Sequence, residues 1–472
     1  MSRRLSYAYQ INKFIQRFPD LCVDGPVIKC RVCEINLLGW SAYQCKRHVE
    51  SQTHKKNRLL QLPYWVFLYD LIFMFSVCNI PLCVVDNEQF RLFWQKYVPK
   101  WPLPQSRRLY RHLQRVKEET ENNMLSDLRG KKLWVTVDEI ADRKNNKIGH
   151  VLARILTPEK ANKPYLLASK RLPKNNAESI QQLVTQALEK FCIEKNNVLM
   201  LVTGGAAYMA KAAVLLKNVY PNLLHVTCML QVLHCVAEVI RNNYQAVDNL
   251  ISSTAKIFLK SPQRIKEFHK SCPGISEPPQ PISTRSGTWL KACFYYSKYF
   301  HDVKSVIFKF DPSKSHAIRE CQQMYEDPEV VENLHTIQDK YSILRNVIDQ
   351  LEDGSIPLDQ SFQIVDNVNT VLQNLTDVPG TEATSKFNDL LQKNLDLPKL
   401  GNILQSLHEG NAANDLDQYF KYANITSLDV ERSFSKYVAL FADKRMCLKE
   451  ATTEAILMIQ TYAMVHHSRA TK

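Results

Sequence analysis

Short apolar runs separated by turn residues dominate residues 131–227. The run at 132–143 reads KLWVTVDEIADR, and the β-branched and aromatic residues at 134–137 predict a buried strand. Two further runs, at 149–156 and 164–172, predict an antiparallel meander beside it. The pattern then reads helix, strand, helix, and finally a short strand with its helix, at 178–193, 197–205, 206–219 and 223–242. This order of elements is typical of a ribonuclease-H-like sheet.

Helical spacing dominates the chain on both sides of these runs. Residues 63–125 predict helices, one of which places Phe90, Phe93, Trp94 and Tyr97 on a single face. Residues 245–425 lose the strand pattern and predict an all-α insertion. The chain then finishes in two amphipathic helices, and Glu431 lies at the head of the first.

A compact cysteine and histidine motif precedes all of these elements. Cys30-x2-Cys33 is followed by Gly39-Trp40 and then by His48-x5-His54, with fourteen residues between Cys33 and His48. Two thiolates and two imidazoles satisfy tetrahedral Zn²⁺, so the motif predicts a small ββα-type zinc finger. The histidine spacing is one residue longer than the common range, which predicts that the helix loosens before His54.

The expected fold class is therefore α+β and multidomain, with five segments. We expect a zinc finger at 1–60, a helical intermediate domain at 61–128, and the first part of a ribonuclease-H-like core at 129–244. An all-α insertion at 245–424 and the end of the core at 425–472 complete the chain.

The net charge of the chain indicates what kind of partner it binds. The 472 residues carry a net charge of +14, and residues 1–130, with 20 Lys and Arg against 11 Asp and Glu, contribute +9 of it. Such an excess indicates a polyanionic partner, and a finger with a basic helix is suited to double-stranded DNA. The candidate DNA-binding residues are Arg47, Lys55, Lys56 and Arg58; the alternative is a zinc site used only for folding or for protein contact.

Two further observations exclude other classes of protein. The thirteen cysteines are scattered and odd in number, which is typical of free thiols in a reducing compartment. The apolar run at 62–84 contains Asp70 and Pro81, so a packed core helix explains it better than a membrane span. No membrane partner is expected.

Asp138 is the first candidate for chemistry outside the finger. It follows an apolar strand, where rigid backbone would hold its carboxylate in place, as a divalent metal for phosphoryl transfer requires. The alternative is a turn at the strand end in which Asp138 caps the next element.

Together, these motifs resemble one family over nearly the whole chain. The segments WVTVDEIADR, LVTGGAAYMAKA, CMLQVLH, STRSGTWL and SLDVERSFSKYVALFADKR follow the zinc finger in that order. This order is similar to the hAT superfamily of DNA transposases, and within it to proteins described as CGG triplet repeat-binding protein-like. The finger resembles the BED class.

The resemblance implies a ribonuclease-H-like catalytic core interrupted by a helical insert, with three carboxylates on two divalent metals. Asp138 matches the first carboxylate and Glu431 the last, while Gly204 stands where the family has an aspartate. Two further positions depart from the family pattern: Gln231 replaces a histidine, although His234 lies one turn further along, and Ser286 replaces a tryptophan. Residues 203–219 contain no Asp or Glu that could substitute for the missing ligand.

Losing one anionic ligand should cost several kcal/mol of transition-state stabilisation, on the order of 10³-fold in rate. The resulting expectation is a nuclear DNA-binding protein derived from a hAT transposase, with structural Zn²⁺, without Mg²⁺ and without catalysis. The alternatives are an active or recently decayed transposase that uses Mg²⁺, and a protein-interaction scaffold without sequence-specific DNA binding.

The resemblance also implies that the C-terminal segment packs subunits together as a dimerisation element. Its two helices place a set of apolar side chains on their faces, and burial of these faces within one chain is the alternative to a homo-oligomer. The set comprises Phe434, Tyr437, Val438, Phe441, Ile456, Leu457, Ile459 and Met464.

Overall fold

The computed structural model describes most of the chain, and Gly39, Trp40 and Arg285 lie outside the described residues. Two compact units are present, Met1–Val116 and Lys117–Lys472, and each is treated by itself. The described residues are 18, 20–24, 27–33, 35–37, 42–61, 64–259, 261–281, 286–409, 415–441 and 448–470.

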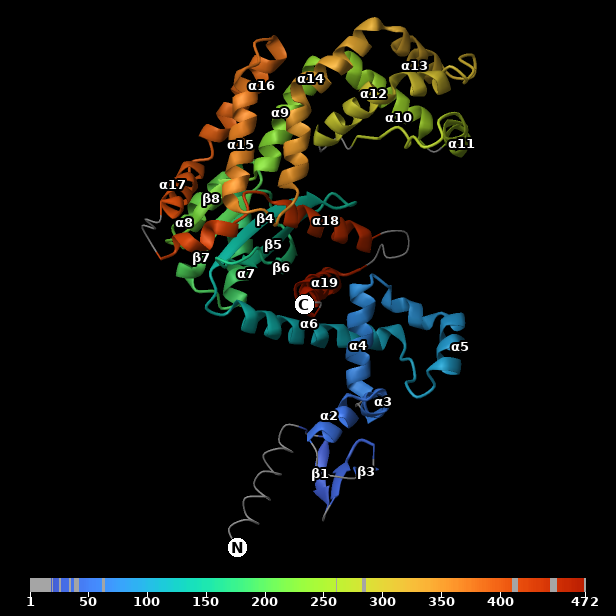
Figure 1. Cartoon of the computed structure of the whole chain (residues 1–472), viewed down its shortest axis with the longest axis vertical. Helices are drawn as coiled ribbons and strands as arrows, with labels where there is room; N and C mark the ends of the chain where they lie inside the picture. Colours follow the sequence, from blue (N-terminus) through green and yellow to red (C-terminus); the bar gives the residue numbers. More distant parts are fainter. Residues whose placement is uncertain are drawn as a thin grey trace. The chain divides into compact units, whose positions relative to one another are not determined.

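The first unit begins with a three-stranded antiparallel sheet in the order β1-β2-β3, followed by two short helices (Figure 1). The ββα prediction was wrong in omitting the first strand, which forms because Leu21 pairs with Cys30 and is buried with Ile28. The elements are β1 (Leu21–Asp24), β2 (Val27–Cys30), β3 (Ile35–Leu37), α2 (Ala42–Glu50) and α3 (Gln52–Gln61).

Helices form the rest of the first unit, as the periodicity predicted. Among the described residues, no helix is long and apolar enough to cross a membrane. The apolar face expected at Phe90, Phe93, Trp94 and Tyr97 is only half correct, because Phe93 and Tyr97 are exposed. The elements are α4 (Tyr64–Val77), η1 (Leu82–Asp86), α5 (Glu88–Tyr97) and α6 (Ser106–Leu128), and the last of these continues into the second unit.

A five-stranded mixed sheet organises the second unit, in the order β6-β5-β4-β7-β8 (Figure 1). The predicted meander is confirmed: β4, β5 and β6 pair antiparallel, while β7 and β8 continue the sheet in parallel from β4. The strands are β4 (Leu133–Ala141), β5 (Lys147–Ile155), β6 (Tyr165–Arg171), β7 (Val198–Thr203) and β8 (Leu224–Thr227).

Helices cover both faces of this sheet. Because strand side chains alternate between faces, Val135 and Val137 pack with α7 and α8, whereas Trp134 packs with α9 on the other side. Asp138 does not end the strand as expected, since β4 continues to Ala141. The helices are α7 (Ala177–Lys190), α8 (Ala207–Lys217) and α9 (Met229–Asn243), and the short η2 (Lys195–Asn197) precedes β7.

The insertion that follows α9 contains only helices among its described residues, as predicted. Helix α16 packs against α9, and α14 lies beside α15 (Figure 1). The elements are α10 (Gln245–Phe258), α11 (Pro262–Ser271), α12 (Ser286–Ile307), α13 (His316–Glu326), α14 (Pro328–Leu351), α15 (Leu358–Gln373), α16 (Val378–Gln392), α17 (Leu397–His408) and η3 (Asp417–Tyr422).

The chain returns to the sheet in α18 (Leu428–Leu440) and α19 (Glu450–Ala470), which pack against β4 and β5 and against β6, respectively. This packing corrects the basis on which self-association was expected. Only Val438 and Met464 of the apolar set are exposed by more than a third, at 47% and 48%. Five of the set, Phe434, Tyr437, Ile456, Leu457 and Ile459, are buried within the chain itself.

Candidate functional site

The four cysteine and histidine residues of the finger come together as one cluster. Cys30 and Cys33 lie at and just after the end of β2, while His48 and His54 lie in α2 and α3. One ligand atom from each of the four falls within 4.8 Å of all the others. Among the residues that the structure describes, no other group of three or more Cys, His, Asp and Glu converges in this way.

The spacing of these ligand atoms fits a tetrahedral metal ion. The Nδ1 atom of His54 lies 3.4 Å from each cysteine Sγ and 3.1 Å from Nε2 of His48. Zn–S bonds of about 2.3 Å and Zn–N bonds of about 2.0–2.1 Å place tetrahedral ligand atoms roughly 3.3–3.8 Å apart. Burial and the neighbouring His54 lower the pKa of His48, which favours the neutral imidazole that binds metal. The donor set suits Zn²⁺, and its atoms lie close enough together to surround one ion.

The long histidine spacing is explained by a break in the helix at Ser51. Helix α2 ends at Glu50 and α3 begins at Gln52, so the helix loosens before His54 as the spacing predicted. The hydroxyl of Ser51 accepts a hydrogen bond from the backbone N–H of His54 at 3.1 Å, which is the geometry of an N-cap. This cap starts the new helix and turns His54 back toward the cysteines.

Two side chains around the cluster were missed by the sequence reasoning. Asp20 Oδ2 lies 3.2 Å from His54 Nε2, and Asn57 Nδ2 donates to Cys33 Sγ at 3.4 Å. Both contacts orient the ligands from outside the metal site. Neither has a sequence signal, because they depend on how β1 and α3 meet.

The candidate DNA-binding residues lie on the two finger helices. Arg47, Lys55 and Lys56 are exposed, and none of the three forms an ion pair with another described residue. Arg58 is different, because its Nε lies 3.3 Å from Asp20 Oδ2 while 58% of its side chain is exposed. Three cations on this surface are therefore available to a polyanion, and the fourth is partly committed to the finger itself.

A second set of candidate residues meets at the edge of the five-stranded sheet. The parallel pairing of β4 with β7 ends at Val137 and Thr203, which brings the next residues, Asp138 and Gly204, beside one another. A Cβ atom placed on Gly204 would lie 3.2 Å from Asp138 Oδ1. Glu431, in the first turn of α18, is close enough for its charge to act on Asp138. The structure thus places Gly204 beside Asp138, and the charge of Glu431 contributes to the electrostatics of Asp138.

Gln231, at the start of α9, fills the space beside Gly204. Its Nε2 donates to Asp138 Oδ2 at 3.1 Å, and its Oε1 accepts from the backbone N–H of Gly205 at 2.7 Å. The other carboxylate oxygen of Asp138 accepts from the backbone N–H of Glu139 at 2.9 Å. Both oxygens of Asp138 therefore already accept hydrogen bonds from the protein. An amide now occupies the position from which a second carboxylate would have approached.

Burial and neighbouring negative charges both act on Asp138 at this edge of the sheet. Burial, with smaller contributions from the charges of Glu139 and Glu431, raises the pKa of Asp138 to about 7. Glu139 accepts a hydrogen bond from the hydroxyl of Tyr208 on α8. The other oxygen of Glu139, Oε2, is buried without a hydrogen-bond partner among the described residues, and Asp138 takes up a proton near neutral pH.

His234, one turn beyond Gln231, contacts Gly287, the residue after Ser286. Nδ1 of His234 accepts a hydrogen bond from the backbone N–H of Gly287 at 3.1 Å. A Cβ atom at Gly287 would come within 2.8 Å of the His234 ring, so only glycine fits this close approach. His234 therefore caps the first turn of α12 through its ring nitrogen.

A buried ion pair holds the helix that carries Glu431. The guanidinium of Arg154 on β5 pairs with Asp429, and their side chains are each 5% exposed. Arg154 also donates to the carbonyl of Gly354 at 2.8 Å and lies 5.3 Å above the ring of Trp134. These contacts join β5, α18 and the loop between α14 and α15, so the sheet edge is held by internal polar contacts.

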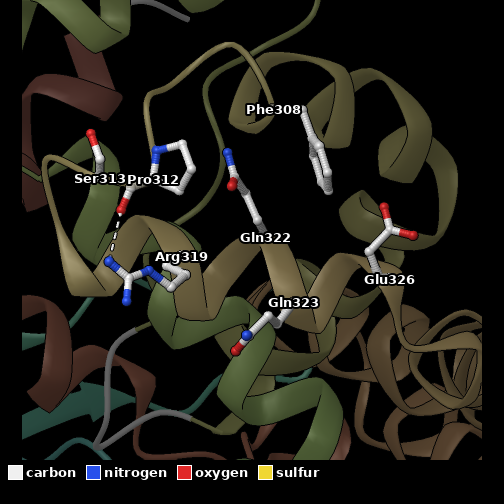
Figure 2. Close-up of a pocket in the computed structure, with 7 residues that line it drawn as sticks. All are labelled: Phe308, Pro312, Ser313, Arg319, Gln322, Gln323 and Glu326. Carbon is white, nitrogen blue, oxygen red and sulfur yellow. Dashed lines mark hydrogen bonds between the residues drawn. The ribbon is translucent and has the colours of Figure 1, made fainter.

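Two surface hollows lie away from this edge, and neither is lined by Asp138, Gly204 or Glu431. One, of about 610 Å³, lies between the turn after β4, the end of β6 and helices α18 and α19. The other, of about 400 Å³, lies between the end of α12 and α13 (Figure 2). Its polar groups are used internally: Arg319 donates to the carbonyl of Pro312 at 3.5 Å, and Gln322 donates to those of Ile307 and Phe310.

A comparison with protein-family models gives a match to part of the chain. A family model described as a domain of unknown function, DUF659, matches residues 104–257, from just before α6 to the end of α10. The match covers the sheet, Asp138, Gly204 and Gln231, but neither the finger nor Glu431. No curated protein matches the chain.

Proposed function

We propose that this chain is a double-stranded DNA-binding protein derived from a hAT-type transposase, with a zinc finger for DNA contact and a core that does not catalyse. The DUF659 match supports the hAT-related origin of residues 104–257. The strand order, with three antiparallel strands extended by two parallel ones, supports a ribonuclease-H-like core. We propose the nucleus as the place where such a protein would meet its DNA.

One observation carries the proposed loss of catalysis: the hydrogen-bonded contact of Gln231 with Asp138 beside Gly204. Two-metal phosphoryl transfer needs ions about 4 Å apart, neutralised by several carboxylates whose lone pairs face them. Here a glycine offers no oxygen, and the Gln231 amide directs an N–H group at Asp138. An N–H donor at this place stabilises the carboxylate without a metal and opposes the entry of a cation.

The proposed DNA contact rests on the finger. Its cluster fits Zn²⁺, whose binding would stabilise a unit with a core of only a few buried side chains. Exposed Arg47, Lys55 and Lys56 stand on the two helices of this unit. Cations on a small zinc-stapled unit can neutralise phosphates and release counterions, which is the main source of affinity for DNA.

The test is selection of bound sequences from random double-stranded DNA by the full-length, zinc-loaded protein, followed by a salt titration of the enriched site. We expect enrichment, and we expect the combined changes Arg47→Gln, Lys55→Gln and Lys56→Gln to flatten the salt slope by up to about 3, near 0.9 for each lost phosphate contact. Replacing Lys160, Lys174 and Lys195 by Gln removes the same charge from the second unit and serves as the control.

The outcomes separate the remaining candidates. Absence of enrichment over non-specific binding favours a protein-interaction scaffold whose finger does not read DNA. Equal effects of the two triple variants show that binding follows overall charge and that the finger is not the DNA contact. Metal-dependent cutting of the selected DNA favours an active transposase.

A further inference from the structure

We infer that Asp20 is a positioning residue of the zinc site. Its carboxylate accepts a hydrogen bond from the Nε2–H group of His54, and this contact directs Nδ1 of the same ring at the metal. The inference rests on the proposed binding of zinc by the finger, and it does not depend on DNA binding.

The ring of His54 is buried, and its two nitrogens face different partners. Nδ1 points into the cluster, 3.4 Å from the Sγ atoms of Cys30 and Cys33, while Nε2 lies 3.2 Å from Asp20 Oδ2. A neutral imidazole has one N–H donor and one acceptor nitrogen, and only the acceptor binds a metal. A carboxylate at Nε2 therefore selects the tautomer whose lone pair is on Nδ1, the nitrogen that faces the other ligands.

Asp20 is held firmly enough to impose this choice. Its backbone carbonyl accepts the N–H of Arg31 at 2.9 Å, and the next residue, Leu21, pairs with Cys30. The carboxylate is thus tied to the element that carries the cysteines, although it contacts a histidine on α3. With a side chain only 16% exposed, Asp20 is also sheltered from competing water.

Arg58 contacts the same carboxylate of Asp20. Its Nε lies 3.3 Å from the same Oδ2 atom that faces His54, so one carboxylate oxygen is shared by a guanidinium and an imidazole. Carboxylates that accept from a metal-bound histidine raise the basicity of the ring, and their loss costs about 10- to 100-fold in metal affinity. The four ligands alone therefore do not define this site.

The experiment measures zinc affinity on the full-length protein by competition with a chelator, for the natural chain and for Asp20→Ala, Asp20→Asn and Asp20→Glu. Glu50→Gln is the matched control, because it removes from the same finger a carboxylate whose ion-pair partner among the described residues is the exposed Lys46. We expect Asp20→Ala to weaken zinc binding by about 10- to 100-fold. The zinc affinity of Asp20→Asn should lie between those of the natural chain and of Asp20→Ala. Its amide oxygen still accepts a hydrogen bond but carries no charge.

Rescue by Asp20→Glu separates positioning from packing. A carboxylate that acts through His54 is partly replaced by glutamate, whereas a side chain that only fills space is not. Equal loss in all three Asp20 variants, or zinc affinity unchanged in Asp20→Ala, overturns the inference while leaving the zinc finger intact. If the natural protein itself takes up no zinc, the proposed finger is wrong, and the role of Asp20 falls with it.

Discussion

The cluster in the finger and the cluster at the sheet edge both gather metal-type residues from distant parts of the chain, yet they are built differently. In the finger, four acceptor atoms converge within 4.8 Å, and the surrounding donors and acceptors attach from outside. At the sheet edge, an amide N–H and a backbone N–H point at the two oxygens of Asp138. Proximity alone therefore does not make a metal site: the lone pairs must face a common point with no donor among them.

The largest expected effect concerns the finger. Cys33→Ser should lower the zinc content from one ion per chain to near zero and unfold the finger, because structural zinc contributes about 10–16 kcal/mol of coupled folding free energy. Metal analysis and thermal unfolding of the full chain provide the measurement, and the core transition should not move. Cys22→Ser is the control, since among the described residues the hydrogen-bond partner of that thiol is the carbonyl of Lys29. Equal zinc content in both variants would refute the assignment of ligands.

The second-largest expected effect concerns the buried ion pair between Arg154 and Asp429, which holds the sheet edge. Arg154→Met leaves the buried Asp429 with the exposed Arg432, 3.9 Å away, as its ion-pair partner, and loss of the close buried partner should cost about 3–5 kcal/mol in the free energy of unfolding of the core. The double variant Arg154→Met, Asp429→Leu should recover most of this loss, because it removes both charges. Denaturant unfolding compares the three proteins. If the single variant is as stable as the natural chain, the pair does not hold α18.

The pH dependence of stability tests the raised pKa of Asp138. Its folded pKa of about 7 exceeds an unfolded value near 3.9, so the folded state binds more protons between these values. Stability from this group is therefore complete below about pH 4 and is lost as the pH rises through 7. Asparagine does not titrate, so Asp138→Asn avoids this loss. As the pH rises from 4 to 8, the free energy of unfolding of the variant should rise by on the order of 2 kcal/mol relative to that of the natural chain.

Asp142 provides a control, because its pKa is shifted in the opposite direction to that of Asp138. Hydrogen bonds from Asn146 lower the pKa of Asp142, so its contribution to stability is present above about pH 4 and lost as the pH falls. Asp142→Asn should therefore be destabilising near neutral pH and lose that effect in acid. The same pH trend in both variants would contradict the account of Asp138.

The smallest effect tests whether Gly204 and Gln231 together exclude a metal. Gly204 does not have a positive φ, so the backbone accepts an aspartate without the strain that a left-handed residue would bring. Its Cβ would, however, approach Gln231 Oε1 to 3.2 Å, so Gly204→Asp alone leaves the amide in the way. We expect Mn²⁺ binding to improve by about tenfold, or 1.4 kcal/mol, only when Gln231→Ala is added.

Spin-resonance titration of Mn²⁺ into the zinc-loaded proteins gives this affinity. Gly205→Asp with Gln231→Ala is the control, since it adds the same charge at an exposed neighbour of Gly204. Equal gains in the two double variants would mean that charge, and not position, attracts the ion. Tight binding by Gly204→Asp alone would show that Gln231 does not obstruct the site.

The sequence predicts those features that depend on local patterns. Apolar runs located the strands and their order along the chain. The spacing of the cysteines and histidines located the finger cluster and the break before His54. The missing features depend on tertiary contacts. A single buried residue, Leu21, decides whether β1 forms, and an apolar helix face does not reveal that Ile456 and Phe434 find their partners within the chain. Gln231 and Asp20 contact residues that are distant in the sequence, so no motif spacing predicts these contacts.

The central claim is that the chain binds DNA without cutting it, and one measurement tests it most directly. The full-length, zinc-loaded protein is incubated with supercoiled plasmid carrying the selected site, in Mg²⁺ or Mn²⁺, and each sample is run with and without removal of the protein. The account predicts a retarded complex that returns fully supercoiled DNA. Metal-dependent nicking that Asp138→Ala abolishes would contradict it.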